Sequence, residues 1–295
     1  MSCQKPREVY RPAIGGPLQF SRPITGNAGI DYHRLNIPCG ECIECQSEKA
    51  RQWAVRIAHE SQLWEENSFV TLSYADEHLP EHNSLNYEDL EQFWDRFRSW
   101  ARREGKPRPR YYSVGEYGDK SLRPHYHACI FGYAFMEERI ILRGGTKPLW
   151  TSEFLRKMWG KGHVSVGQLN FATARYTASY ITKKLKSKQK YVRVDEHTGE
   201  LIPLQQPRAL MSRNIAREWW DKYRHQVSAH DQVIIDGRPQ KPPKAYDKWL
   251  GARSEIAGEM IKEERQKHAQ PTTQEQRDER ARVTHARARS KSKSI

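Results

Sequence analysis

The sequence contains no uncharged apolar run that approaches the roughly 20 residues of a membrane-spanning helix. Its first six residues also lack the apolar core of a secretion signal. We therefore expect a soluble intracellular protein with no membrane partner. A disulfide framework is not expected either, because the chain has five cysteines, an odd number, and three of them are crowded together.

Acidic residues are in the minority, since 36 Asp and Glu face 50 Lys and Arg and give a net charge of +14 over 295 residues. The positive charge is spread along the whole chain, which favours a polyanionic partner over a small acidic substrate. Nucleic acid is the first expectation, and an anionic membrane surface is the second. The length suits one core of ordinary size with smaller attachments.

Apolar periodicity predicts an α+β protein. We expect strands over 68–74, 110–116, 125–133 and 162–169, and helices over 46–65, 171–186 and 212–224. A further helix is expected between a cap at Asn86 and Gly105. Residues 1–38, rich in Pro and Gly, are expected to form an irregular arm.

Four segments are predicted along the chain. They are an arm with cysteines and a helix (1–66), a catalytic core (67–190), an extension without an assignable motif (191–250) and a charged basic tail (251–295). The tail is expected to be helical and then disordered, because its last ten residues have almost nothing to bury.

Two histidines alternate with apolar residues on the third predicted strand. Because side chains alternate along a strand, His125 and His127 project from one face and Tyr126 from the other. If the preceding strand forms a hairpin with this one, Glu116 lies beside His125. Two imidazoles and one carboxylate suit Mg²⁺ or Mn²⁺. A bare His-x-His is equally compatible with a solvated sheet face.

The helix after the fourth strand carries two phenols. Tyr176 and Tyr180 are four residues apart and therefore share one helical face, with Lys183 and Lys184 one turn further on. A separate stripe, Ala174, Ala178, Ile181 and Leu185, is the natural one to bury. Tyrosine pairs at this spacing are usually packing residues, so the pair gains meaning only from the histidine strand before it.

The combination suits cutting and rejoining of a phosphodiester. A tyrosine can hold the phosphate covalently until a 3′-hydroxyl reclaims it, and a metal on Glu116, His125 and His127 can polarise that phosphate. Lys183 can offset the charge that develops on the phosphate. Two tyrosines allow two linked transfers.

These motifs resemble the HUH endonuclease superfamily. His125 to His127 match its H-U-H signature, residues 69–74 its preceding strand motif, and residues 180–183 its Tyr-x-x-Lys motif. The cysteine-rich stretch 38–45 and residues 71–80 are similar to the replication initiators of gokushovirus-type microviruses. The resemblance covers about residues 38–190.

The resemblance implies a central antiparallel sheet flanked by helices, an HUH or RRM-like core, and rolling-circle replication. It also implies nicking of single-stranded DNA at an origin through a 5′-phosphotyrosine intermediate, strand joining, and a host bacterial cytoplasm. No Gly-x-x-x-x-Gly-Lys-Ser/Thr pattern is found, unlike in initiators that append a helicase. A host helicase and a DNA polymerase are therefore expected as partners.

The crowded cysteines have metal-ligand spacing. Cys39, Cys42 and Cys45 can bind structural Zn²⁺ with Cys3 as the fourth ligand, and His33 competes for that position. An iron–sulfur cluster and three metal-free thiols are the alternatives. Cys129, on the histidine strand, is expected to be a small buried residue.

Two other functions fit parts of the sequence. A transposase or plasmid relaxase would share the histidine pair and act on different DNA ends. A non-catalytic single-stranded nucleic-acid-binding protein would use the positive charge, a zinc knuckle and stacking aromatic residues.

Overall fold

The computed structural model describes residues 3–22, 31–118, 121–184, 191–195, 198–269 and 272–292, and it leaves the side chains of 181–184 and 287–292 undescribed. The chain divides into two compact units. The first unit consists of residues 1–49 and 267–295, and the second of residues 50–266. Among the described helices, none has the length and apolar character needed to cross a membrane.

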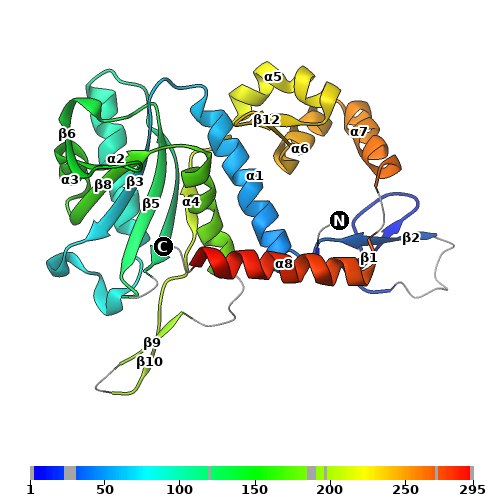
Figure 1. Cartoon of the computed structure of the whole chain (residues 1–295), viewed down its shortest axis with the longest axis horizontal. Helices are drawn as coiled ribbons and strands as arrows, with labels where there is room; N and C mark the ends of the chain where they lie inside the picture. Colours follow the sequence, from blue (N-terminus) through cyan, green and yellow to red (C-terminus); the bar gives the residue numbers. More distant parts are fainter. Residues whose placement is uncertain are drawn as a thin grey trace. The chain divides into compact units, whose positions relative to one another are not determined.

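The second unit is built on a seven-stranded antiparallel sheet (Figure 1). Its order is β11 (Ala209–Met211), β4 (Arg110–Tyr117), β5 (Pro124–Phe131), β3 (Asn67–Tyr74), β8 (Gly162–Gln168), β7 (Leu149–Ser152) and β6 (Arg139–Arg143). The predicted α+β class with a central antiparallel sheet is confirmed, and the four predicted strands are its central members.

Helices cover both faces of this sheet (Figure 1). On one face, α2 (Tyr87–Arg103) and α3 (Glu153–Trp159) pack against β3, β5 and β8. On the other face, α1 (Ile43–Ser61) and α4 (Phe171–Lys184) contribute to a second core that also takes side chains from β4 and β5. Both faces of β5 are therefore covered.

Helix α2 forms for the reasons that its sequence suggests. The Asn86 side chain caps it by accepting a hydrogen bond from the Glu88 backbone N–H at 3.0 Å. Its apolar stripe is fully buried and consists of Leu90, Phe93, Trp94 and Phe97. The ring of Trp94 stacks on that of Tyr111 in β4, with centroids 3.6 Å apart.

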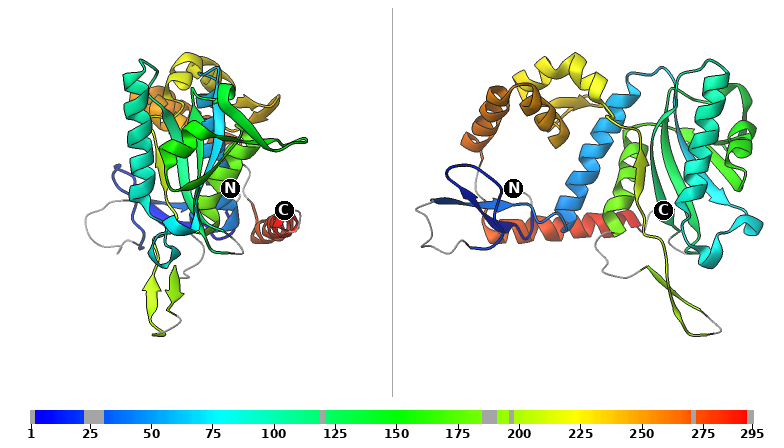
Figure 2. Two further views of the ribbon diagram at one scale, coloured as in Figure 1. Left: turned by 90° about the vertical axis from the view of Figure 1, so that its left-hand side faces the viewer. Right: turned by 180° about the vertical axis from the view of Figure 1, so that it is seen from behind.

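The second core is completed by the elements after the sheet. These are α5 (Arg217–His230), the hairpin of β12 (Val233–Ile235) and β13 (Arg238–Gln240), α6 (Lys244–Arg253) and α7 (Glu255–Lys267). A further hairpin, β9 (Val192–Val194) with β10 (Leu201–Pro203), projects from the sheet (Figure 2). Three 3₁₀ turns lie at Asp76–His78, Glu81–Asn83 and Met136–Glu138.

In the first unit, residues 1–38 contain more structure than an irregular arm, so that prediction is wrong. Strands β1 (Arg7–Pro12) and β2 (Tyr32–Ile37) form an antiparallel hairpin. The alternation of Val9 and Tyr10 opposite Leu35 and Arg34 is too short to stand out among the surrounding Pro and Gly residues. Pairing between distant segments, rather than local periodicity, specifies these strands.

The end of the chain also differs from the prediction. Helix α8 (Gln274–Ser292) includes residues 286–292, which we expected to be disordered, and residues 293–295 lie outside the described part. Ala and Arg, which recur here, have high helix propensity. An ion pair between Arg282 and Glu279, 3.4 Å apart, adds local support. Burial of an apolar face is not required for such a helix.

One glycine fixes how β8 begins. Gly162 has φ +145, and a Cβ atom there would lie 2.2 Å from the backbone nitrogen of Ala75, at the end of the neighbouring β3. We expect Gly162→Ala to lower the free energy of unfolding by about 3 kcal/mol, because backbone must move to relieve the overlap. Urea denaturation measures this change.

Gly251 in α6 is the matched control, because no heavy atom lies within 4 Å of its would-be Cβ. Gly251→Ala should change the free energy of unfolding by no more than about 1 kcal/mol. Equal midpoints for the two variants would contradict the close approach at Gly162.

Candidate metal and tyrosine site

A carboxylate and two imidazoles converge on one face of the sheet. The antiparallel register of β4 and β5 pairs Glu116 with His125 and Val114 with His127. Oε2 of Glu116 lies 3.6 Å from Nε2 of His125 and 3.4 Å from Nε2 of His127. One ligand atom from each residue lies within 4.8 Å of the other two. The structure therefore brings together the three residues predicted from the sequence.

The second nitrogen of each imidazole is held by a neighbour. Nδ1 of His125 lies 3.2 Å from the Arg123 carbonyl oxygen. Because a carbonyl only accepts, Nδ1 of His125 carries the proton and Nε2 keeps its lone pair. Nδ1 of His127 lies 3.0 Å from the Thr71 hydroxyl. Such outer contacts orient metal-binding histidines.

The donor set fits a divalent cation. Glu116 and His127 are both buried, and within the described ranges Oε2 of Glu116 and Nε2 of His127 have no hydrogen-bond partner. A buried carboxylate oxygen and imidazole nitrogen without partners are costly, and a shared cation would satisfy both. Two imidazoles and a carboxylate are suitable ligands for Mg²⁺ or Mn²⁺.

Protonation of the site also suits a cation. Burial opposes ionisation of Glu116, but the neighbouring imidazoles of His125 and His127 outweigh burial and lower the pKa of this carboxyl. Burial lowers the pKa of His127, which keeps its imidazole in the neutral form that binds metals. An ionised carboxylate therefore lies beside a neutral imidazole.

Helix α4 carries both predicted tyrosines to this group. Asn170 starts the helix, since its Oδ1 accepts from the Thr173 backbone N–H and its own N–H donates to Thr173 Oγ1, both at 2.9 Å. Ala174 and Ala178 are buried, as predicted. The side chain of Ile181 and all of residue 185 lie outside the described part of the chain.

Both phenol rings contact His127. The Tyr180 ring stacks on the His127 ring, with centroids 5.3 Å apart and planes 19° apart. The Tyr176 ring meets it edge-on at the same centroid distance. Tyr176 is 38% exposed, whereas Tyr180 is 6% exposed. Tyr180 is therefore more buried than the sequence suggested, because it packs on the imidazole.

Two residues of the site escaped the sequence analysis. Phe69 and Thr71 project from β3 toward the histidines, and the Phe69 ring stacks on His127 at 5.5 Å. The alternation of β3 could have placed them on a common face, but only the strand order shows that this face is the histidine face. Lys183 and Lys184 end α4, and their side chains lie outside the described part, so their roles stay predictions.

The cysteines gather in the first unit. Cys3, Cys39, Cys42 and Cys45 each offer a sulfur within 4.8 Å of the others. His33, the competing fourth ligand, is exposed on β2 and is not in this group. Cys129 is fully buried in β5, as expected for a small core residue.

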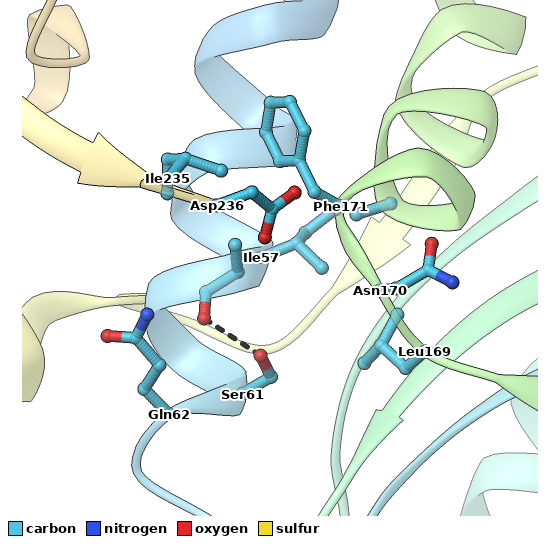
Figure 3. Close-up of a pocket in the computed structure, with 10 residues that line it drawn as sticks. Ile57, Ser61, Gln62, Leu169, Asn170, Phe171, Ile235 and Asp236 are labelled. Carbon is cyan, nitrogen blue, oxygen red and sulfur yellow. Dashed lines mark hydrogen bonds between the residues drawn. The ribbon is translucent and has the colours of Figure 1, made fainter. Parts of the chain in front are cut away.

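A pocket of about 160 Å³ opens elsewhere in the second unit, between α1, the start of α4 and the β12–β13 turn (Figure 3). Apolar Ile57, Leu169, Phe171 and Ile235 line much of it, and Asp236 contributes a carboxylate. Among the described residues that line this pocket there is no histidine, cysteine or second carboxylate. The ionisable and phenolic groups lie together at Glu116, His125, His127, Tyr176 and Tyr180.

Comparison with known proteins points to a viral family. The family model for replication-associated protein ORF2 matches residues 67–185. The chain is 30% identical to replication-associated protein VP4 of Bdellovibrio phage phiMH2K over 257 residues, which are 84% of this chain and 77% of that relative.

Two further relatives are replication-associated proteins. Over 292 residues the chain is 30% identical to replication-associated protein ORF2 of Spiroplasma virus 4, with 92% of this chain and 88% of that relative covered. It is 31% identical to replication-associated protein ORF4 of Chlamydia phage 1 over 163 residues, which are 52% of this chain and 41% of that relative. No significant match is found among solved structures.

Proposed function

Because this chain belongs to the ORF2 family of viral replication-associated proteins, we propose that it starts rolling-circle replication by nicking single-stranded DNA at an origin. The observation that carries the proposal is the position of two phenol rings 5.3 Å from the ring of His127, which lies beside Glu116 and His125. A nucleophile and a set of metal ligands then share one surface.

The proposed reaction is a reversible transfer of a phosphate. A phenolic oxygen of Tyr176 or Tyr180 attacks the phosphorus, the 3′-oxygen leaves and takes up a proton, and the 5′ phosphate stays on the tyrosine as an ester. A 3′-hydroxyl later attacks the same phosphorus, gives up its proton and frees the phenol. The bond energy is kept, so the same site can join ends.

The chain's own residues have separate tasks in this scheme. Glu116, His125 and His127 would hold Mg²⁺ or Mn²⁺, which polarises the scissile phosphate when bound. Thr71 and the Arg123 carbonyl orient the imidazoles. Lys183 and Lys184, one turn beyond Tyr180, are proposed to offset negative charge on the phosphate.

Two tyrosines allow the circle to be closed. The more exposed Tyr176 is the more accessible to an incoming strand, and Tyr180 lies against the same imidazole. One phenol would carry the 5′ end while the other cuts again after a full circuit. The free 3′ end needs a DNA polymerase, and we propose a host helicase for strand separation, both in the bacterial cytoplasm where phages replicate.

Covalent capture tests the proposal. The full chain is incubated with labelled single-stranded oligonucleotides that tile the viral genome, in Mn²⁺ or Mg²⁺, and separated in SDS. We expect one oligonucleotide to give a protein adduct that chelation of the metal prevents. A non-catalytic binding protein would retain the DNA in native gels and give no adduct. A transposase or relaxase would react with other DNA ends.

Removal of the chain after Val283 tests the contribution of charge to DNA binding. The removed stretch carries four basic residues and no acidic ones, namely Arg287, Arg289, Lys291 and Lys293. We expect weaker binding and a salt dependence of log K that is flatter by about 0.7 for each phosphate that the shortened chain no longer neutralises. Fluorescence anisotropy at several salt concentrations measures this slope. An unchanged slope would exclude the stretch as a DNA contact.

A further inference from the structure

The fold of the first unit brings four thiols to one point. Antiparallel pairing of β1 and β2 sets Arg7 opposite Ile37, so the chain just before Arg7 and just after Ile37 lies at the same end of the hairpin. Cys3 precedes Arg7 by four residues and Cys39 follows Ile37 by two. The backbone N–H of Cys39 donates to Sγ of Cys3 at 3.2 Å.

The turn that follows is shaped around the sulfur of Cys39. Sγ of Cys39 accepts hydrogen bonds from the backbone N–H groups of Glu41 at 3.4 Å and of Cys42 at 3.3 Å. Gly40 has φ +79, a conformation that favours glycine. Backbone N–H groups directed at a sulfur favour its thiolate form, which is the form that binds metals.

The other two thiols lie at the start of a helix. Cys42 immediately precedes α1, and Cys45 lies in its first turn. The positive end of a helix stabilises thiolates. The buried Gln46 side chain donates to the Gly40 carbonyl at 2.6 Å and fixes the turn against the helix.

We propose that Cys3, Cys39, Cys42 and Cys45 bind one structural Zn²⁺. Four sulfurs within 4.8 Å of one another match the closed tetrahedral thiolate site that zinc prefers. Sγ of Cys42 and Sγ of Cys3 are 3.9 Å apart, well beyond the roughly 2.05 Å of a disulfide. With four protein ligands no position is left open for substrate, so this ion is structural and distinct from the ion proposed for nicking.

Zinc at this point fastens the β1–β2 hairpin to the start of α1. The same junction is otherwise spanned by an exposed ion pair between Arg7 and Glu41, 2.8 Å apart, and exposed ion pairs contribute little stability. Residues 3–45 are therefore expected to depend on the metal for their structure. Its removal should make this stretch sensitive to protease while the sheet of the second unit stays resistant.

Metal analysis of the purified full chain tests the proposal. We expect about one zinc per chain by elemental analysis. Replacement with Co²⁺ should give the visible absorption of a tetrahedral thiolate site. Cys42→Ser should lose the zinc and the cobalt spectrum, and protease should then cut within residues 3–45. The controls are Cys129→Ala, which removes a cysteine outside the cluster, and the double variant His125→Ala with His127→Ala.

Each result decides between the alternatives. Zinc retained in both controls and lost in Cys42→Ser supports the site. Wild-type protein that holds no zinc and gives no cobalt spectrum overturns it, as does zinc that is lost with the histidines and kept by Cys42→Ser. Iron with the visible absorption of an iron–sulfur cluster would replace zinc by such a cluster. Because bound metal is measured without DNA, failure here leaves the proposed nicking untouched.

Discussion

Replacing both Tyr176 and Tyr180 with phenylalanine is expected to abolish the covalent DNA adduct. Phenylalanine keeps the ring that packs on His127 and removes only the oxygen that attacks phosphorus. Loss of a catalytic nucleophile can cost up to about 10⁶-fold in rate, so we expect a decrease of at least about 10³-fold. Adduct formation in SDS gels with the origin oligonucleotide measures it, and native gels should show that DNA is still bound.

The single variants separate the two phenols. Tyr176→Phe and Tyr180→Phe each leave one oxygen beside His127, so each should still form an adduct but fail to release a closed circle. Tyr223→Phe, on α5 and outside the site, is the matched control and should behave as wild type. If the double variant forms as much adduct as wild type, the nucleophile is elsewhere. If one single variant loses all adduct, only that tyrosine attacks first.

The metal-ligand geometry was predictable from the sequence because it depends on short-range rules. Alternation along β5 sets His125 and His127 on one face, and a short connection between β4 and β5 fixes the register that pairs Glu116 with His125. The spacing of Tyr176 and Tyr180 gave a common helical face by the same kind of rule. Periodicity within one element, or across one hairpin, was sufficient.

Features that depend on distant partners were not predictable. Strand β11 has three residues and no periodic signal, and it exists because it pairs with β4. Its approach is fixed by the Arg208 backbone N–H, which donates to the Tyr87 hydroxyl at 2.6 Å. Helix α5 begins at Arg217, later than the predicted Ser212, because residues 209–211 join the sheet first. Cys3 was one of two candidates until the hairpin β1–β2 selected it.

Glu116→Gln is expected to remove most nicking activity without unfolding the chain. The substitution keeps the shape of the side chain and replaces an anionic ligand by a neutral amide, which binds Mg²⁺ and Mn²⁺ poorly. Since the metal provides several kcal/mol of charge stabilisation in the transition state, the nicking rate should fall by about 10³-fold. Rates with the origin oligonucleotide, and Mn²⁺ binding followed by electron paramagnetic resonance, measure both effects.

A graded series tests whether the loss comes from the metal. Thr71→Val removes the hydroxyl 3.0 Å from Nδ1 of His127 and should cost about 10- to 100-fold, the usual effect of losing an outer contact to a metal-binding histidine. Glu65→Gln, an exposed carboxylate outside the site, should nick as wild type. Higher Mn²⁺ should restore Thr71→Val more than Glu116→Gln, because the first keeps all three ligands. Wild-type rates in Glu116→Gln would mean that this carboxylate holds no catalytic metal, and the buried pair of Glu116 and His127 would then be a structural contact of the sheet.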